Sequence, residues 1–131
     1  IVSNYAGGEK KPWVSPLDIA AVVAEEMDKP FAGRTIRYIA SEEISPDDVA
    51  ATLGQAIGKP GLKWELVSGE ELLSTWLAAG MNAEVAKGFI EMQESQSSGV
   101  LYEDYYRNRP VLGKVKLADF AKEFAGVYNA E

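Results

Sequence analysis

The sequence predicts a single mixed α/β domain over residues 1–131, in which a small sheet with one parallel βαβ unit is packed by about five helices. Three observations lead to this fold class. Residues 34–40 and 62–67 alternate as strands do, and a helical pattern lies between them. Further helical patterns occupy residues 68–93 and the region after Lys116. A chain of 131 residues is long enough to bury one core and short for two domains.

The N-terminal residues have the pattern of a strand. Residues 1–5 form this strand candidate, and a turn with two glycines and two lysines follows at residues 6–12. No Met and no leader segment precedes the strand pattern. We therefore expect this chain to have been cut from a longer protein.

A helix that starts at Pro16 and ends near Asp28 is expected to organise the rest of the chain. Ser15 is a suitable N-cap, and Asp18 lies in the first turn, near the positive end of the helix dipole. Residues 16–24 are apolar on nearly every side. Because a helix of that kind is covered on two sides, we expect it to lie sandwiched between layers. A connector at residues 29–33 follows.

The predicted βαβ unit consists of the strand at 34–40, a helix at 46–57 and the strand at 62–67. Ser45 supplies an N-cap, and Gly58 supplies the position after the last helical residue. A crossover of this length joins parallel strands with a right-handed turn. The apolar side of the helix should therefore lie on the sheet.

The C-terminal half is predicted to be helical, with one loop. Ser68 and Glu71 fit a capping box for one helix, and Asn82 can cap the next, so that the two form a helical hairpin. Residues 102–110 are aromatic and have no regular period, which predicts a loop. A last helix begins near Lys116.

Composition excludes several classes of function. The net charge is −7 and the 13 basic residues are scattered, which argues against nucleic-acid binding. No apolar run approaches the roughly 20 residues that span a bilayer, so we expect no membrane insertion. The chain has no cysteine and no histidine, which removes thiolate chemistry, imidazole ligands and Ser-His-Asp catalysis. A cytoplasmic location fits the absence of disulfides best.

Only weak candidates for a binding site remain. Gly7 and Gly8 follow a strand pattern but lack the spacing of a phosphate-binding loop, and a plain turn explains them better. Tyr105 and Tyr106 either line a pocket or fasten a long loop to the core, and the second role is favoured. Four adjacent carboxylate pairs are better explained as helix caps or solvated helix ends than as cation sites, namely Glu25-Glu26, Glu42-Glu43, Asp47-Asp48 and Glu70-Glu71.

The sequence resembles the C-terminal half of NmrA-like proteins. The resemblance is carried by residues 1–8, by the Val-x-x-x-Asp-Ile-Ala pattern that ends at Ala20, by residues 33–36 and 56–60, and by Arg109-Pro110 and 119–121. These proteins belong to the atypical short-chain dehydrogenase/reductase superfamily, whose members bind NAD(P) on an N-terminal Rossmann domain. The resemblance implies that this chain is the C-terminal substrate lobe and lacks that domain.

The resemblance assigns no catalytic, cofactor or metal residue to this chain. The family's glycine-rich fingerprint has no counterpart, and no tyrosine is followed by a lysine four residues on. NAD(P) is implied for the parent protein only. By the likeness, four residues are expected to line a cleft for a small-molecule substrate, namely Asn4, Trp13, Tyr105 and Tyr106.

Two functions follow from this reading. The chain is either the substrate side of an NAD(P)-dependent oxidoreductase or NAD(P)-sensing regulator, or a small binding or assembly module that works without a cofactor. Without the Rossmann half, one apolar face of the helix at 16–28 lacks its cover. We therefore expect self-association, most simply as a two-fold dimer whose contact lies near residues 1–5 and this helix.

Overall fold

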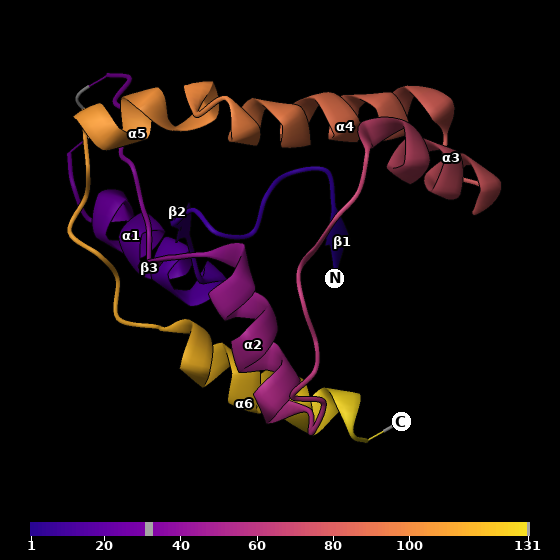
Figure 1. Ribbon diagram of the computed structural model, residues 1–131. Helices are drawn as coiled ribbons and strands as arrows, with labels where there is room; N and C mark the ends of the chain where they lie inside the picture. The colour runs from indigo at the N-terminus through magenta and orange to yellow at the C-terminus, as the bar shows by residue number, and fades with distance from the viewer. Residues whose placement is uncertain (31–32, 131) are drawn as a thin grey trace.

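The computed structural model describes residues 1–30 and 33–130 and confirms a mixed α/β fold with a small parallel sheet (Figure 1). Within these residues there are six α-helices, one more than expected, and one short 3-10 helix. The predicted connector at 29–33 includes Phe31 and Ala32, which lie outside the described residues. In chain order the elements are β1 (Val2–Ser3), β2 (Lys11–Trp13), α1 (Pro16–Met27), β3 (Glu42–Ile44), α2 (Pro46–Ala56), β4 (Glu65–Leu66), α3 (Gly69–Ala78), α4 (Ala83–Ser97), η1 (Val100–Tyr102), α5 (Glu103–Arg107) and α6 (Leu117–Tyr128).

The strands form two separate pairs. Strand β1 pairs with β4 in parallel, with Val2 opposite Glu65, and β2 pairs with β3 in the antiparallel sense. The predicted pairing of 34–40 with 62–67 is wrong, because residues 34–40 form no strand and β4 takes the N-terminal strand as its partner. Backbone hydrogen bonds from Glu65 to the Ile1 carbonyl (2.7 Å) and from Val67 to the Ser3 carbonyl (2.9 Å) fix that choice.

The turn predicted at residues 6–12 is shorter than expected. Its last two residues, Lys11 and Pro12, belong to β2, which runs on to Trp13. The Trp13 carbonyl also accepts a hydrogen bond of 2.7 Å from the Ser41 amide. Lys11 and Pro12 are therefore strand residues. A strand of three residues is too short to show the alternation by which a strand is predicted from sequence.

Helix α1 begins and ends where the sequence predicts but is not sandwiched. The Ser15 hydroxyl accepts a hydrogen bond from the Leu17 amide, and Asp28 is the C-cap. Asp18 is the one buried residue of the helix, whereas Leu17 is 61% and Val23 51% exposed. The expected second cover, and most of the first, is absent from the described residues of this chain.

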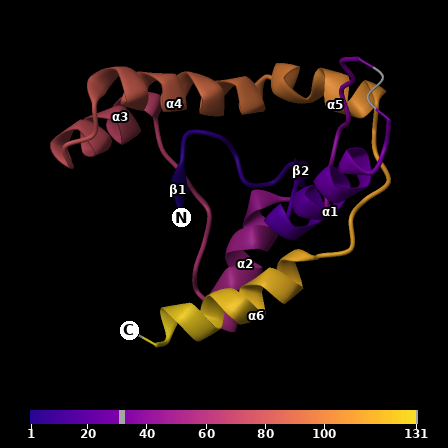
Figure 2. The ribbon, with the colours of Figure 1, turned by 180° about the vertical axis from the view of Figure 1, so that it is seen from behind.

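Helix α2 matches its prediction and packs against α6. The Ser45 hydroxyl accepts from the Asp48 amide at 3.1 Å, and the Asp48 carboxylate accepts from the Ser45 amide, which closes a capping box. Val49 and Ala50 are buried. Figures 1 and 2 show α2 and α6 side by side from both directions, and their residues are in contact.

The helical hairpin of α3 and α4 is confirmed, but the loop expected at 102–110 is wrong for residues 102–107, which are helical, and holds only for residues 108–110. Helix α4 extends to Ser97, and η1 and α5 continue in nearly the same line (Figure 1). Helix α5 has five residues and is too short to show an apolar period. Exposed charged pairs at helical spacing support it, since Arg107 contacts Glu103 at 3.2 Å and Asp104 at 3.1 Å. The sequence pattern of an isolated short helix of this kind does not differ from that of a loop.

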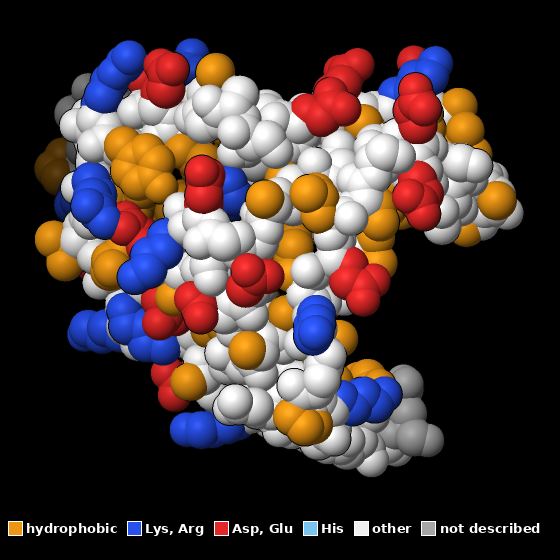
Figure 3. All heavy atoms as spheres, viewed as in Figure 1, with side chains coloured by type: hydrophobic (Ala, Val, Ile, Leu, Met, Phe, Trp, Pro, Cys, Tyr) orange, Lys and Arg blue, Asp and Glu red, His pale blue; other side chains and the backbone are white. Residues whose placement is uncertain are grey.

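The space-filling view shows a hollow between the arm formed by α3 and α4 and the C-terminal end of α6 (Figure 3). Acidic side chains are spread over this face, as expected for the net charge of −7. No helix among residues 1–30 and 33–130 has the length and apolar character needed to cross a membrane.

Candidate functional site

Asp18 is the centre of a buried hydrogen-bonded junction between three segments. Its carboxylate accepts from the Ser41 hydroxyl at 2.6 Å and from the amides of Lys114 and Val115, each at 3.1 Å. The Ser41 oxygen in turn accepts from the Ser15 amide at 2.8 Å. The first turn of α1 is thereby fastened to the segment before β3 and to the segment before α6.

The same junction holds residues 113–116 tightly. The Gly113 amide donates to the Ala40 carbonyl at 2.8 Å, and the Lys116 ammonium donates to the carbonyls of Ser41 (2.7 Å) and Gly113 (2.8 Å). A side chain at position 113 would meet Asp18, because a Cβ there would lie 2.2 Å from Asp18 Oδ2. Glycine is therefore required by close approach.

These contacts predict that Asp18 makes the protein sensitive to acid. The hydrogen bond from the Ser41 hydroxyl, followed by those from Val115 and Lys114, holds the pKa of Asp18 below its ordinary value. A carboxyl with a lowered pKa stabilises the folded state above its unfolded pKa of about 3.9, and this stabilisation is lost as the pH falls through the folded pKa. We expect the free energy of unfolding to fall below about pH 4, and to fall less steeply in Asp18→Asn.

Urea denaturation over a series of pH values measures this slope. Glu26→Gln is the matched control, since the pKa of Glu26 is also lowered by its contacts with Lys29 and Arg37, but this carboxylate is exposed and screened by water. The control should keep the wild-type slope. Equal slopes for wild type and Asp18→Asn would show that Asp18 does not contribute to acid sensitivity.

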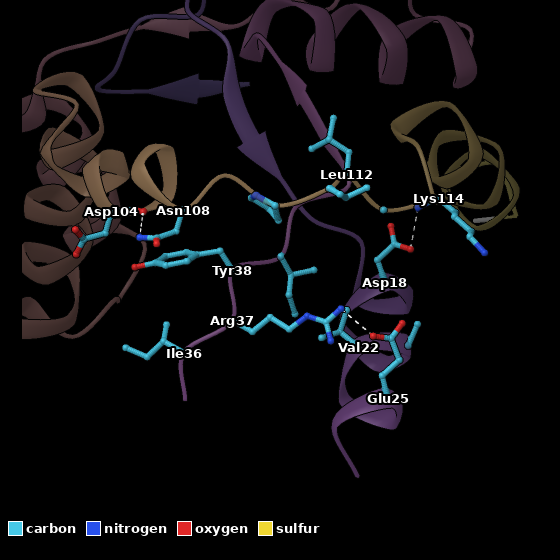
Figure 4. Close-up of a pocket in the computed structure, with 15 residues that line it drawn as sticks. Asp18, Val22, Glu25, Ile36, Arg37, Tyr38, Asp104, Asn108, Leu112 and Lys114 are labelled. Atoms are coloured by element: carbon cyan, nitrogen blue, oxygen red, sulfur yellow. Dashed lines mark hydrogen bonds and ion pairs between the residues drawn. The ribbon is translucent and has the colours of Figure 1, made fainter. Parts of the chain in front are cut away.

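A cavity of about 830 Å³, the larger of the two that we describe, lies beside this junction (Figure 4). One wall is α1, another is the extended segment that leads to β3, and the third is α5 with the segment that follows it. The lining residues are Asp18, Ala21, Val22, Glu25, Ile36, Arg37, Tyr38, Ile39, Asp104, Asn108, Pro110, Val111, Leu112, Gly113 and Lys114.

The charged groups of the larger cavity are largely paired. Arg37 contacts Glu25 at 2.8 Å and Glu26 at 2.6 Å, and these carboxylates raise the pKa of the guanidinium. Figure 4 shows Tyr38 lying toward α5 while Arg37 extends toward α1. This cavity offers a phenol and a mixed lining of apolar and paired charged groups, which suits binding better than acid–base chemistry.

A second cavity of about 360 Å³ lies between β2, α2 and α6. Trp13 lines it, together with apolar side chains that include Leu53 and Phe120. The Trp13 indole donates to the Ile44 carbonyl at 3.1 Å, so its polar atom is satisfied and its ring is held in place. Of the four expected substrate residues, Trp13 is the one that lines either of these two cavities.

Tyr105 and Tyr106 lie together on α5, with ring centroids 5.2 Å apart. Tyr105 is buried, packs edge-on against Tyr38 and donates to Glu43 at 2.7 Å. Arg109 pairs with the same carboxylate. Tyr106 is exposed. The contacts of Tyr105 are those of a residue that fastens α5 to β3.

Asn4 directly follows β1 and lies against α4, whereas the tyrosines lie on α5. Its side-chain amide donates to the Ile90 carbonyl at 3.4 Å, and its backbone amide donates to the Gln93 side chain at 3.3 Å. The Asn4 Oδ1 atom is buried and has no hydrogen-bond partner among the described residues. The four expected residues therefore do not share either of the two cavities described above.

The glycine turn at Gly7, between β1 and β2, lies against the first turn of α2 and does not fit a dinucleotide pyrophosphate. The Gly7 carbonyl accepts from the Asp47 amide at 3.0 Å, and the Asp47 carboxylate fills the space where a Gly7 side chain would stand. An acidic group at that place repels phosphate. Among residues 1–30 and 33–130, no cluster of three or more carboxylates is close enough to hold a metal ion.

Comparison with solved structures identifies the fold. Two structures of triphenylmethane reductase from Citrobacter sp. match 95% of this chain, with TM-scores of 0.68 and 0.70 and sequence identities of 19% and 21%. The second of these was solved in complex with NADP(H). This chain has the fold of part of a reductase.

The chain spans less than half of these reductases, 43% and 44% of their length. No protein-family model matches the sequence, and the comparison with curated proteins gave no match. The fold expected from the resemblance, a portion of a Rossmann-type protein, is confirmed by the structural likeness to part of triphenylmethane reductase.

The sequence pattern predicts a helix-dipole role for Asp18 and does not predict the hydrogen-bonded junction that the structure shows. One signal was present. Asp18 is the only charged residue among positions 16–24, in a helix that is otherwise apolar. A lone carboxylate in such a setting indicates a specific buried partner.

Proposed function

We propose that this chain is the substrate-binding portion of an NAD(P)-dependent oxidoreductase, or of an NAD(P)-sensing relative, in the NmrA-like family. The observation that supports the proposal is the fold likeness, which extends over nearly all of this chain and less than half of triphenylmethane reductase. The rest of such a protein would carry the nucleotide. A cytoplasmic location is part of the same proposal.

In this proposal the chain supplies surface for the substrate and leaves NAD(P) to residues outside it. The Asp47 carboxylate that lies against Gly7 supports this proposal, because it would repel the phosphates of a dinucleotide at that turn. Asn4, Trp13, Tyr105 and Tyr106 remain our candidates for substrate contact. Trp13 and Tyr106 are the better placed, since one lines a cavity and the other is exposed, whereas Tyr105 is buried on Glu43.

A second candidate function is a cofactor-independent module that acts through self-association. It is favoured by the exposed apolar side chains of α1, because contiguous apolar surface on a soluble protein commonly marks an interface. Leu17, Ile19, Val23 and Met27 are all exposed. A two-fold dimer through this face is the simplest form of the proposal.

Calorimetric titration with NADP(H) and NAD(H), combined with sedimentation, separates the two candidates. We expect the 131-residue chain to bind neither dinucleotide and the complete product of its reading frame to bind one of them with micromolar affinity. Saturable binding of either dinucleotide by the 131-residue chain would contradict the proposal that NAD(P) binds to residues outside it. A complete product that binds no dinucleotide, together with a chain that dimerises, would favour the module.

A further inference from the structure

Residues 34–40 have the sequence pattern of a strand but pair with no other strand among the described residues. Their sequence alternates, and Figure 4 shows the side chains of Ile36 and Tyr38 on one side of the segment and that of Arg37 on the other, as in an extended backbone. Among the described residues, the first backbone hydrogen bond from this segment to another is at Ala40, whose carbonyl accepts from Gly113. The amides and carbonyls of residues 34–39 are thus free of backbone partners in the part of the chain that the structure describes.

Both side-chain faces of this segment nevertheless contact helices. The Tyr38 ring lies edge-on to the Tyr105 ring of α5, with centroids 6.3 Å apart. Its neighbour Arg37 reaches the opposite way, to Glu25 and Glu26 of α1 (Figure 4). Successive side chains of a strand point to opposite faces, and helices on both faces are typical of a strand within an open, mostly parallel sheet.

The missing neighbour of residues 34–40 is therefore a strand beside them that would bond to their backbone, and not a helix packed on either face. An extended segment with free amides and carbonyls is a template for another strand. The side chains around it are also uncovered: Ile36 is 75% and Val111 is 97% exposed, and Met27 at the end of α1 is 80% exposed. The larger cavity lies along the same segment.

We propose that residues 34–40 form an edge strand that receives a β-strand from the nucleotide-binding portion of the parent protein. This inference rests on the proposed function. The occupant follows from the comparison, since more than half of each matched reductase lies outside the part that this chain covers. Strand addition would satisfy the free backbone groups, and the same contact would cover the exposed apolar side chains of α1.

Hydrogen exchange measured by mass spectrometry tests the proposal directly. In the 131-residue chain, the amides of residues 35–39 should exchange nearly as fast as those of an unstructured peptide. In the complete product of the reading frame they should exchange at least about 100-fold more slowly. The amides of α2 provide the internal reference and should be protected in both proteins.

Proline substitution adds a readout that does not depend on exchange. Successive N–H groups of a strand point to opposite edges, so proline is placed separately at Thr35 and at Ile36, with Thr35→Ala and Ile36→Ala as matched controls. All four variants should leave the unfolding midpoint of the 131-residue chain unchanged. In the complete product, one proline variant should lower the midpoint well below that of its alanine control.

The outcomes separate this inference from the function on which it rests. Fast exchange at 35–39 in a complete product that binds NADP(H) would overturn the edge strand and leave the function standing. Protection in a complete product that binds no dinucleotide would support the edge strand and remove the function. Protection that appears in the 131-residue chain as its concentration rises would show that a second copy occupies the edge, and would overturn the proposal.

Discussion

Replacing Gly113 by alanine is expected to lower the free energy of unfolding by about 3 kcal/mol. The new Cβ would lie 2.2 Å from Asp18 Oδ2 and 2.4 Å from Asp18 Cγ, so the carboxylate would have to move. The carboxylate accepts three hydrogen bonds, from Ser41, Lys114 and Val115, and a displaced carboxylate loses them. The variant therefore combines overpacking with the loss of buried hydrogen bonds.

Urea denaturation of Gly113→Ala beside Gly61→Ala measures this effect. No atom lies within 4 Å of a Cβ built at Gly61, so that substitution should change the free energy of unfolding by no more than about 0.5 kcal/mol. The double variant Gly113→Ala, Asp18→Ala should be less destabilised than the sum of the two single variants, because both disrupt one junction. Near-identical midpoints for Gly113→Ala and Gly61→Ala would mean that the junction tolerates a side chain.

Replacing Gly54 by alanine is expected to destabilise the protein by about 2 kcal/mol, although alanine is the better helix former by about 1 kcal/mol. Gly54 is buried in α2, and a Cβ there would lie 2.6 Å from the Lys59 carbonyl oxygen and 2.8 Å from Leu62 Cβ. The Lys59 amide donates to the Gly54 carbonyl at 2.7 Å. The backbone after the helix is therefore held against it and has no easy way to withdraw.

Gly126→Ala is the matched control for this prediction. Gly126 is also within a helix, α6, and a Cβ there would meet no atom within 4 Å. This variant should gain stability, by up to about 1 kcal/mol, from helix propensity alone. If Gly54→Ala were stabilised to the same extent in thermal or urea unfolding, the close approach of residues 59–62 to α2 would be wrong.

Much of the fold could be predicted from the sequence because its helix boundaries are encoded locally. Ser15, Ser45, Ser68 and Asn82 each accept a hydrogen bond from an amide in the first turn of the helix that they were predicted to cap. Such contacts involve neighbours in sequence and depend little on the rest of the molecule. The helical hairpin followed from them.

Strand pairing and the candidate site depended on distant residues and were harder to predict. Residues 34–40 have the alternation of a strand, but pairing needs a second strand, and β4 pairs with the N-terminal residues instead. The prediction that α1 is covered on two sides is wrong for the same reason. The apolar pattern of α1 predicts packing partners on two sides of the helix, and the described residues do not supply them. Sequence alone also cannot place Tyr105 on Glu43, 62 positions away.

The parallel pair of β1 and β4 has a consequence for synthesis. The Ile1 ammonium donates to the Lys63 carbonyl at 2.9 Å, across a separation of 62 residues. Closing so long a loop costs entropy that local helical contacts do not, so β1 joins the sheet late in folding. During translation β1 leaves the ribosome before β4 and has to wait for it, while α2 has all the residues it needs to form. The earliest residues of this chain are thus among the last to find their place.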